Sequence, residues 1–151
     1  MAQNAEGQSE GDETGESDGA DGLVVKLHPF AIKEATKKLK NRGKRKHLLD
    51  LVDRLKHFGD QRELHDLRIQ KVGSFYALKL KGGLLGKINL RIYFAHLLDR
   101  NEIVVLKVYK KEEENQIPRH IVLTVENRLE EYLEESALEQ LIFDNEKEKG
   151  I

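Results

Sequence analysis

Lysine, arginine and tyrosine recur at alternate positions along three segments whose alternating pattern predicts strands. The segments are residues 75–81, 88–96 and 102–110. Successive side chains of a strand point to opposite faces, so these residues would share one face of a sheet. The residues on that face are Lys79, Lys81, Arg91, Tyr93, Lys107 and Tyr109, with Ala77, Asn89, Ala95 and Val105 between them. No acid lies among them, and such a concentration of positive charge indicates a polyanion site.

RNA cleavage without a metal is a reaction that such residues can support. A base must take the proton of the ribose 2′-hydroxyl, and a cation must stabilise the charge that builds on the phosphate. Arg91 suits the second task, because a guanidinium stays charged and matches two phosphate oxygens. Lys79 or Lys81 suits the first, because neighbouring cations lower the pKa of a lysine. An ordinary exposed face, with its cations in water, remains the alternative.

Composition narrows the possible chemistry. The 151-residue chain has no cysteine, which excludes disulfides, thiolate metal sites and cysteine nucleophiles. The six histidines show no metal-binding spacing. Neither a secretory signal nor an apolar run long enough to cross a membrane is present, so we expect a cytoplasmic protein.

Charge is distributed very unevenly along the chain. Residues 1–22 have seven acids and no base, residues 23–111 have 22 bases against eight acids, and residues 112–151 have four bases against 12 acids. We expect residues 1–22 to be a disordered acidic tail, because they are rich in glycine and lack aromatic residues. The tail either improves solubility or competes with RNA for the basic segment that follows.

The hydrophobic pattern predicts an α+β domain over residues 23–135. A strand at 23–27 precedes a helical hairpin, with helices at 30–40 and 44–58, and a strand meander follows from residue 64 to residue 110. Pro118 would begin a last helix that ends near Glu135, and residues 136–151 would be a C-terminal extension with a short helix and a frayed end. The small antiparallel sheet would pack against the hairpin and this last helix. Its apolar face would contain Tyr76, Leu78, Leu80, Ile88, Leu90, Ile92, Phe94, Val104, Leu106 and Val108.

Three segments resemble the RelE/ParE superfamily of toxins from bacterial type II toxin–antitoxin systems, especially its HigB-like, phage-derived branch. They are LHDLRIQKVGSFYALKLKGG, INLRIYFAH and EIVVLKVYKKEEENQIPRHIVLTVENRLEEYL. The last is the most specific, through Tyr109-Lys110-Lys111, Pro118, Arg128 and Tyr132. The chain departs from the branch pattern in three places: a lysine replaces arginine on the strand at 75–81, the turn at 82–87 is long, and the acidic tail is additional.

The resemblance implies a RelE-like fold and a small toxin that cleaves messenger RNA in the ribosomal A site. A cognate antitoxin protein would inhibit it, and neither a metal nor a small-molecule cofactor would be needed. The implied catalytic residues are Lys79, Lys81, Arg91, Lys110 and Lys111, with Tyr109 as a further candidate. Residues expected to contact RNA or the ribosome are Tyr93, Lys107 and the bases around the hairpin turn: Lys37, Lys38, Lys40, Arg42, Lys44, Arg45 and Lys46.

Two other functions remain open at the level of sequence. The first is a ParE-like protein, which would bind DNA gyrase without cleaving RNA. It stays open because proteins that share a fold can have different functions. A non-catalytic module would use the basic face only to bind RNA or protein.

Overall fold

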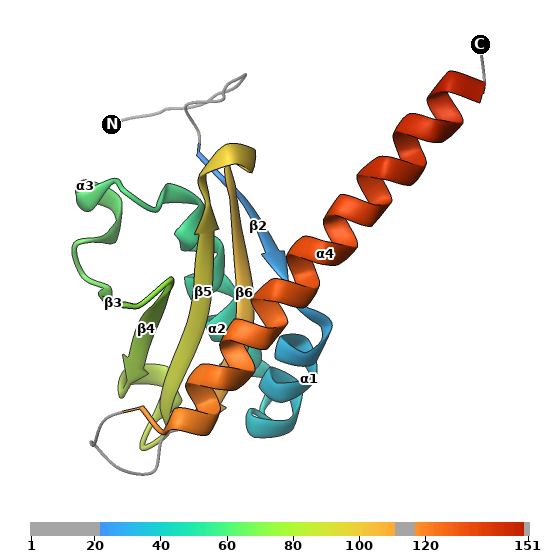
Figure 1. Ribbon diagram of the computed structural model, residues 1–151. Coiled ribbons are helices and arrows are strands. Elements are labelled where there is room, and N and C mark those ends of the chain that lie inside the picture. The colour runs from blue at the N-terminus through green and yellow to red at the C-terminus, as the bar shows by residue number, and fades with distance from the viewer. Residues whose placement is uncertain (1–21, 111–116, 150–151) are drawn as a thin grey trace.

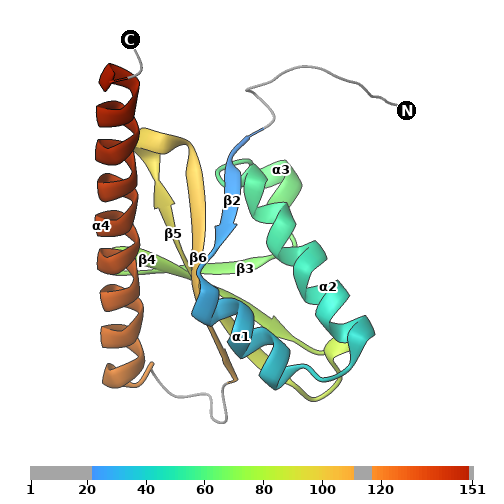
Figure 2. The ribbon, with the colours of Figure 1, turned by 90° about the vertical axis from the view of Figure 1, so that its right-hand side faces the viewer.

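A five-stranded sheet with helices on both faces forms the part of the protein that the structure describes. The computed structural model describes residues 22–110 and 117–149, so the predicted acidic tail lies outside the described residues. Figure 2 shows the sheet between α4 (Arg119–Lys149) on one side and α1 (Pro29–Lys38) with α2 (Arg42–Asp53) on the other. This arrangement confirms the predicted α+β class, with a helical hairpin and a C-terminal helix packed on one sheet.

The strands are β2 (Val24–Leu27), β3 (Arg68–Val72), β4 (Phe75–Lys81), β5 (Asn89–Leu97) and β6 (Glu102–Lys110). Their order in the sheet is β2-β6-β5-β4-β3. Strands β3 to β6 are antiparallel neighbours, but β2 pairs with β6 in parallel. The prediction of an antiparallel sheet is therefore wrong at β2. The long intervening chain, which includes the hairpin, lets two distant strands run in the same direction.

Side-chain caps begin both helices of the hairpin. The Nδ1 atom of His28 accepts a hydrogen bond from the Phe30 amide at 3.1 Å, and Pro29 occupies the first turn of α1. In α2, the Asn41 side chain accepts a hydrogen bond from the Lys44 amide at 3.1 Å. The chain continues through the 3₁₀ turn η3 (Arg54–His57) and the single-turn helix α3 (Gln61–Leu64). Apolar side chains of the hairpin pack against one face of the sheet: Ala31, Leu39, Leu48, Val52 and Leu55.

A β-bulge between β5 and β6 changes which residues share a face. Tyr93 pairs with Lys107, but the next residue, Phe94, pairs with Val105, so Leu106 has no partner. The additional residue reverses the alternation in β6. Val105 therefore joins the core under the hairpin, whereas Val104 and Leu106 pack with the core under α4. The sequence-based face assignment was wrong for these three residues, because simple alternation assumes an unbulged strand.

Helix α4 is a single helix from Arg119 to Lys149, so the predicted end near Glu135 is wrong. No glycine or proline interrupts residues 119–149, and helix-favouring Glu, Ala, Leu and Gln continue past residue 135. Its first half packs on the sheet through Ile121 and Val125, beside Phe75 and Tyr93. The second half extends beyond the sheet (Figure 1).

A cluster of charged groups connects α1, β6 and α4 where β2 ends. Strand β2 pairs with β6 only as far as Val105. Beyond this point, Glu34 of α1 accepts a hydrogen bond from the Val108 amide at 3.0 Å, and Arg128 of α4 donates one to the Leu106 carbonyl at 2.8 Å. Glu34 also accepts hydrogen bonds from Lys107 at 2.7 Å and from Arg128 at 2.9 Å. We call Glu34, Lys107 and Arg128 the edge cluster.

Candidate nucleic-acid interface

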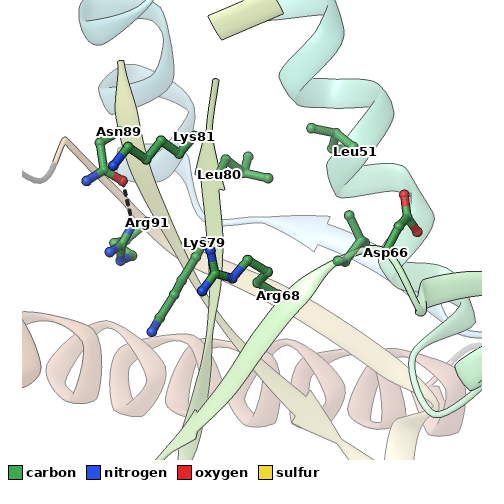
Figure 3. Close-up of a pocket in the computed structure, with 9 residues that line it drawn as sticks. Leu51, Asp66, Arg68, Lys79, Leu80, Lys81, Asn89 and Arg91 are labelled. Atoms are coloured by element: carbon green, nitrogen blue, oxygen red, sulfur yellow. Dashed lines mark hydrogen bonds between the residues drawn. The ribbon is translucent and has the colours of Figure 1, made fainter. Parts of the chain in front are cut away.

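The unequal lengths of β3 and β4 create a pocket at one edge of the sheet. Strand β3 begins at Arg68, which pairs with Lys79, so Leu80 and Lys81 at the end of β4 have no partner in β3. A pocket of about 350 Å³ lies at this step. We call it the notch pocket. Its lining residues are Leu51, Asp66, Leu67, Arg68, Lys79, Leu80, Lys81, Asn89 and Arg91, most of which are labelled in Figure 3.

Three cationic side chains meet at the notch pocket because strand register aligns them. Arg68 pairs with Lys79, and Lys79 pairs with Arg91, so one residue from each of three adjacent strands lies in a transverse row. Neighbouring strands are about 4.8 Å apart, which is close enough for these side chains to act on one ligand. Figure 3 shows the three side chains on the same side of the sheet. We call Arg68, Lys79 and Arg91 the cation row.

Arg91 is the most rigidly held member of the cation row. It is only 8% exposed. Its Nη1 atom donates hydrogen bonds to the Asn89 side chain at 2.6 Å and to the Leu90 carbonyl at 3.3 Å. Within the described residues, none of the three cations forms an ion pair with a carboxylate. The row therefore offers positive charge to an anionic ligand.

Asp66 is the acidic side chain of the notch pocket, and another arginine already neutralises it. Arg54 donates hydrogen bonds to both Asp66 oxygens, at 2.6 and 3.1 Å. The hydrogen bond from Arg54 is the main reason that the pKa of Asp66 falls to about 2. Figure 3 places Asp66 on the opposite side of the pocket from Arg91. The carboxylate therefore does not oppose an anion bound at the cation row.

Other residues from the predicted catalytic set lie near the row to different extents. Lys81 lines the notch pocket, and half-buried Tyr109 of β6 pairs with Arg91, which extends the row by one strand. Lys110 is exposed but pairs with Leu90, so its side chain belongs to the opposite face of the sheet. Lys111 lies outside the described residues. The structure thus brings Lys79, Lys81, Arg91 and Tyr109 together but separates Lys110 from them.

Two residues expected to contact RNA are instead part of the packed structure. Tyr93 is only 1% exposed beneath α4, and its ring packs edge-on against Phe75 with centroids 5.8 Å apart. Burial raises the pKa of the Tyr93 phenol to about 12. Lys107 is occupied by Glu34 in the edge cluster. Their positions correct the prediction that the whole basic face is available to RNA, because α4 covers its centre.

The bases of the helical hairpin surround the α1–α2 turn. Lys37, Lys40, Arg42 and Lys46 are exposed, whereas Lys38, Lys44 and Arg45 are half-buried. Arg45 donates a hydrogen bond to the Leu39 carbonyl at 2.9 Å, which holds the turn closed. The four exposed bases therefore provide a positive surface, in which Lys46 also forms an ion pair with Asp50 at 3.4 Å.

Arg68 is a candidate site residue that the sequence-based interpretation missed. The turn at Gly73-Ser74 was expected, and its two residues join Val72 to Phe75 as the first pair of the β3–β4 hairpin. Counting back from that pair in antiparallel register leads to Arg68 opposite Lys79. The position of this turn therefore fixes the register that places Arg68 in the cation row.

The described residues contain no group of three or more His, Asp or Glu side chains able to hold a metal ion. Within the same part of the chain, no helix is long and apolar enough to cross a membrane.

No protein-family profile matches the sequence, and no curated protein matches it. Among solved structures, the chain is similar to a mutant of the E. coli toxin RelE in the free state. The TM-score is 0.43 and the identity is 16%, over 60% of this chain and 85% of that chain.

Proposed function

We propose that the notch pocket binds the phosphodiester backbone of RNA and cleaves it without a metal, and that the protein is a ribosome-dependent toxin of the RelE type. The observation that carries the proposal is the cation row. It combines three positive side chains from three strands at one pocket, and the acid of that pocket is already paired with Arg54. The sequence resemblance adds messenger RNA in the ribosomal A site as substrate and an antitoxin protein as inhibitor.

Each part of the pocket has a role in this reaction. The ribose 2′-oxygen forms a bond to phosphorus while the bond from phosphorus to the 5′-oxygen breaks, which gives a cyclic phosphate and a 5′-hydroxyl. Arg91 stabilises the negative charge on the phosphoryl oxygens, and its fixed position suits this role because donors aligned in advance need no reorganisation. One of the two lysines, Lys79 or Lys81, accepts the 2′-hydroxyl proton on a neutral amine while the other stays charged, and the departing 5′-oxygen takes up a proton from water. Arg68 holds the neighbouring phosphate, and the apolar side of the pocket contacts the sugar and base.

Cleavage on translating ribosomes is the experiment that tests the proposal. Purified protein is added to a translated messenger and, separately, to the same RNA without ribosomes, and primer extension locates the cuts. The proposal requires cuts that appear only with ribosomes. Inhibition of gyrase supercoiling without RNA cleavage would instead favour the ParE-like alternative. RNA binding with no cleavage in either mixture would instead favour the alternative of a non-catalytic binding module.

The exposed bases of the hairpin turn are expected to contribute affinity for the ribosome rather than chemistry. Replacing Lys37, Lys40, Arg42 and Lys46 with glutamine should weaken ribosome binding at low salt. The dependence of log affinity on log salt should flatten by about 0.7–0.9 for each phosphate that the variant no longer neutralises. Cleavage by the bound enzyme should keep its rate, because these residues lie outside the notch pocket.

Ribosome binding across a salt series and single-turnover cleavage at saturating protein measure these two effects. Glutamine substitutions at four exposed bases outside the hairpin turn and the notch pocket, Lys26, Arg62, Lys71 and Lys87, are the control matched for net charge. An equal flattening in the control would show that overall charge, and not the hairpin turn, determines the affinity.

A further inference from the structure

An exposed apolar stripe lies on the second half of α4, where the helix extends past the sheet (Figure 1). Leu138, Leu141 and Ile142 are 58%, 67% and 51% exposed. Spacings of three and four residues place side chains on one side of a helix, so these three form a continuous strip. We call them the distal stripe. Exposed leucines and isoleucines grouped in this way are typical of protein-interaction surfaces.

The distal stripe lies on a different side of α4 from the residues that pack on the sheet, and Leu141 lies farthest from them. Tyr132 marks the covered side of α4, because its hydroxyl donates a hydrogen bond to Glu102 of β6 at 2.8 Å. Leu141 is nine residues farther along, which is about two and a half turns of helix. It therefore faces nearly opposite to Tyr132. The sheet that buries the first half of α4 does not cover the distal stripe.

Acidic side chains surround the distal stripe without any basic neighbour in the sequence. Residues 129–146 contain seven acids and no lysine or arginine. Glu134, Glu135 and Glu139 are exposed, and each is within four residues of Leu138. None of these three glutamates forms an ion pair with a residue in the described ranges. The surface therefore combines an apolar centre with a negative rim.

The negative rim argues against a second copy as the occupant of the distal stripe. Two copies packed stripe to stripe would bring glutamates close to glutamates, which is destabilising. The surface area of three side chains is also smaller than the ~800 Å² that each partner buries in a standard interface. A stable contact must therefore include the glutamates of the rim. The basic hairpin turn of the same molecule lies at the end opposite to the C-terminus of α4 and cannot cover the stripe (Figure 2).

We propose that the distal stripe docks an amphipathic helix of a partner protein whose own apolar stripe is flanked by lysine and arginine. Leucine and isoleucine at spacings of three and four residues fit between the side chains of a facing helix, as in a coiled coil. Basic residues beside that stripe would lie against Glu134, Glu135 and Glu139. This charge complementarity would favour basic partners over acidic ones. The proposal is independent of the RNA reaction, because no residue of the distal stripe lines the notch pocket.

A pair of synthetic helical peptides tests the docking surface on the full-length protein. One peptide has leucines on one side flanked by lysines, and the other has the same composition in scrambled order. Fluorescence anisotropy at physiological salt should show the ordered peptide binding at least about tenfold more tightly than the scrambled one. The triple substitution Leu138→Gln, Leu141→Gln and Ile142→Gln should remove this difference. Glutamine keeps a high helix propensity, and circular dichroism checks that the helix persists.

A control substitution and a charge reversal complete the test. Leu98→Gln changes a 78% exposed leucine on the turn η5 (Leu98–Arg100) and should leave peptide binding unchanged. Reversing the rim with Glu134→Lys, Glu135→Lys and Glu139→Lys should transfer the preference to an ordered peptide with glutamates beside its leucines. Equal binding of the ordered and scrambled peptides would overturn the proposal. So would a concentration-dependent dimer, seen by sedimentation, that the glutamine triple variant abolishes.

Discussion

Replacing Arg91 with alanine is expected to lower the rate of ribosome-dependent RNA cleavage about 10²–10³-fold. Arg91 is the member of the cation row whose side chain is already held in place, by Asn89 at 2.6 Å and by the Leu90 carbonyl. Removing it takes away a positive charge that would stabilise the negative phosphoryl oxygens of the transition state. Single-turnover cleavage at saturating protein measures the effect on chemistry separately from the effect on binding.

Two further variants separate catalysis from folding and from general charge. Arg91→Lys keeps the charge but loses the planar fork, so its cleavage rate should lie between those of the wild type and Arg91→Ala. Arg62→Ala removes an arginine outside the notch pocket whose side chain is 92% exposed, and this variant should cleave at the wild-type rate. Thermal unfolding shows whether each variant is folded. A folded Arg91→Ala protein that cleaves at the wild-type rate would exclude Arg91 from the mechanism.

Local sequence patterns predicted the strands that carry the candidate site. β4 and β6 have the predicted bounds, and β5 begins and ends one residue later than predicted. Period-two alternation is a strong signal where one face of a strand is buried. The same alternation placed Lys79 and Arg91 on one face, and the register of the sheet pairs them.

Features that depend on contacts between distant segments did not follow from the pattern. The bulge at Leu106 depends on how β5 and β6 pair, and its signal is absent from β6 alone. The burial of Tyr93 depends on α4, which packs across the face that the sequence suggested was open. The pairing of Lys107 with Glu34 joins residues 73 positions apart. Basic and aromatic residues predicted to share one face therefore either contribute to the candidate site or pack inside the structure. Only the tertiary contacts determine which of these two roles each residue has.

Removing the Glu34 carboxylate is expected to produce the largest loss of stability. Lys107 and Arg128 have side chains only 12% and 13% exposed, and both donate to Glu34. A Glu34→Ala protein would bury two unpaired cations and leave the Val108 amide without its acceptor. Breaking one side of a buried ion pair typically costs about 3–5 kcal/mol. Urea unfolding of Glu34→Ala and of Glu126→Ala, an exposed glutamate on α4, measures the difference.

The pH dependence of Glu34→Gln distinguishes the charge of Glu34 from its packing. Burial alone would raise the pKa of Glu34, but hydrogen bonds from Arg128, Lys107 and the Val108 amide outweigh it, so the pKa in the folded protein lies below the ordinary 4.5. A group with a lowered pKa stabilises the fold fully above its unfolded pKa, and this contribution disappears as the pH falls through the folded value. Glutamine has the same size and no charge. The difference in unfolding free energy between wild type and Glu34→Gln should therefore be constant from about pH 6 to 7 and shrink below about pH 4.5. A difference that does not change across this range would mean that the edge cluster stabilises the fold through shape and hydrogen bonding rather than through the ionised carboxylate.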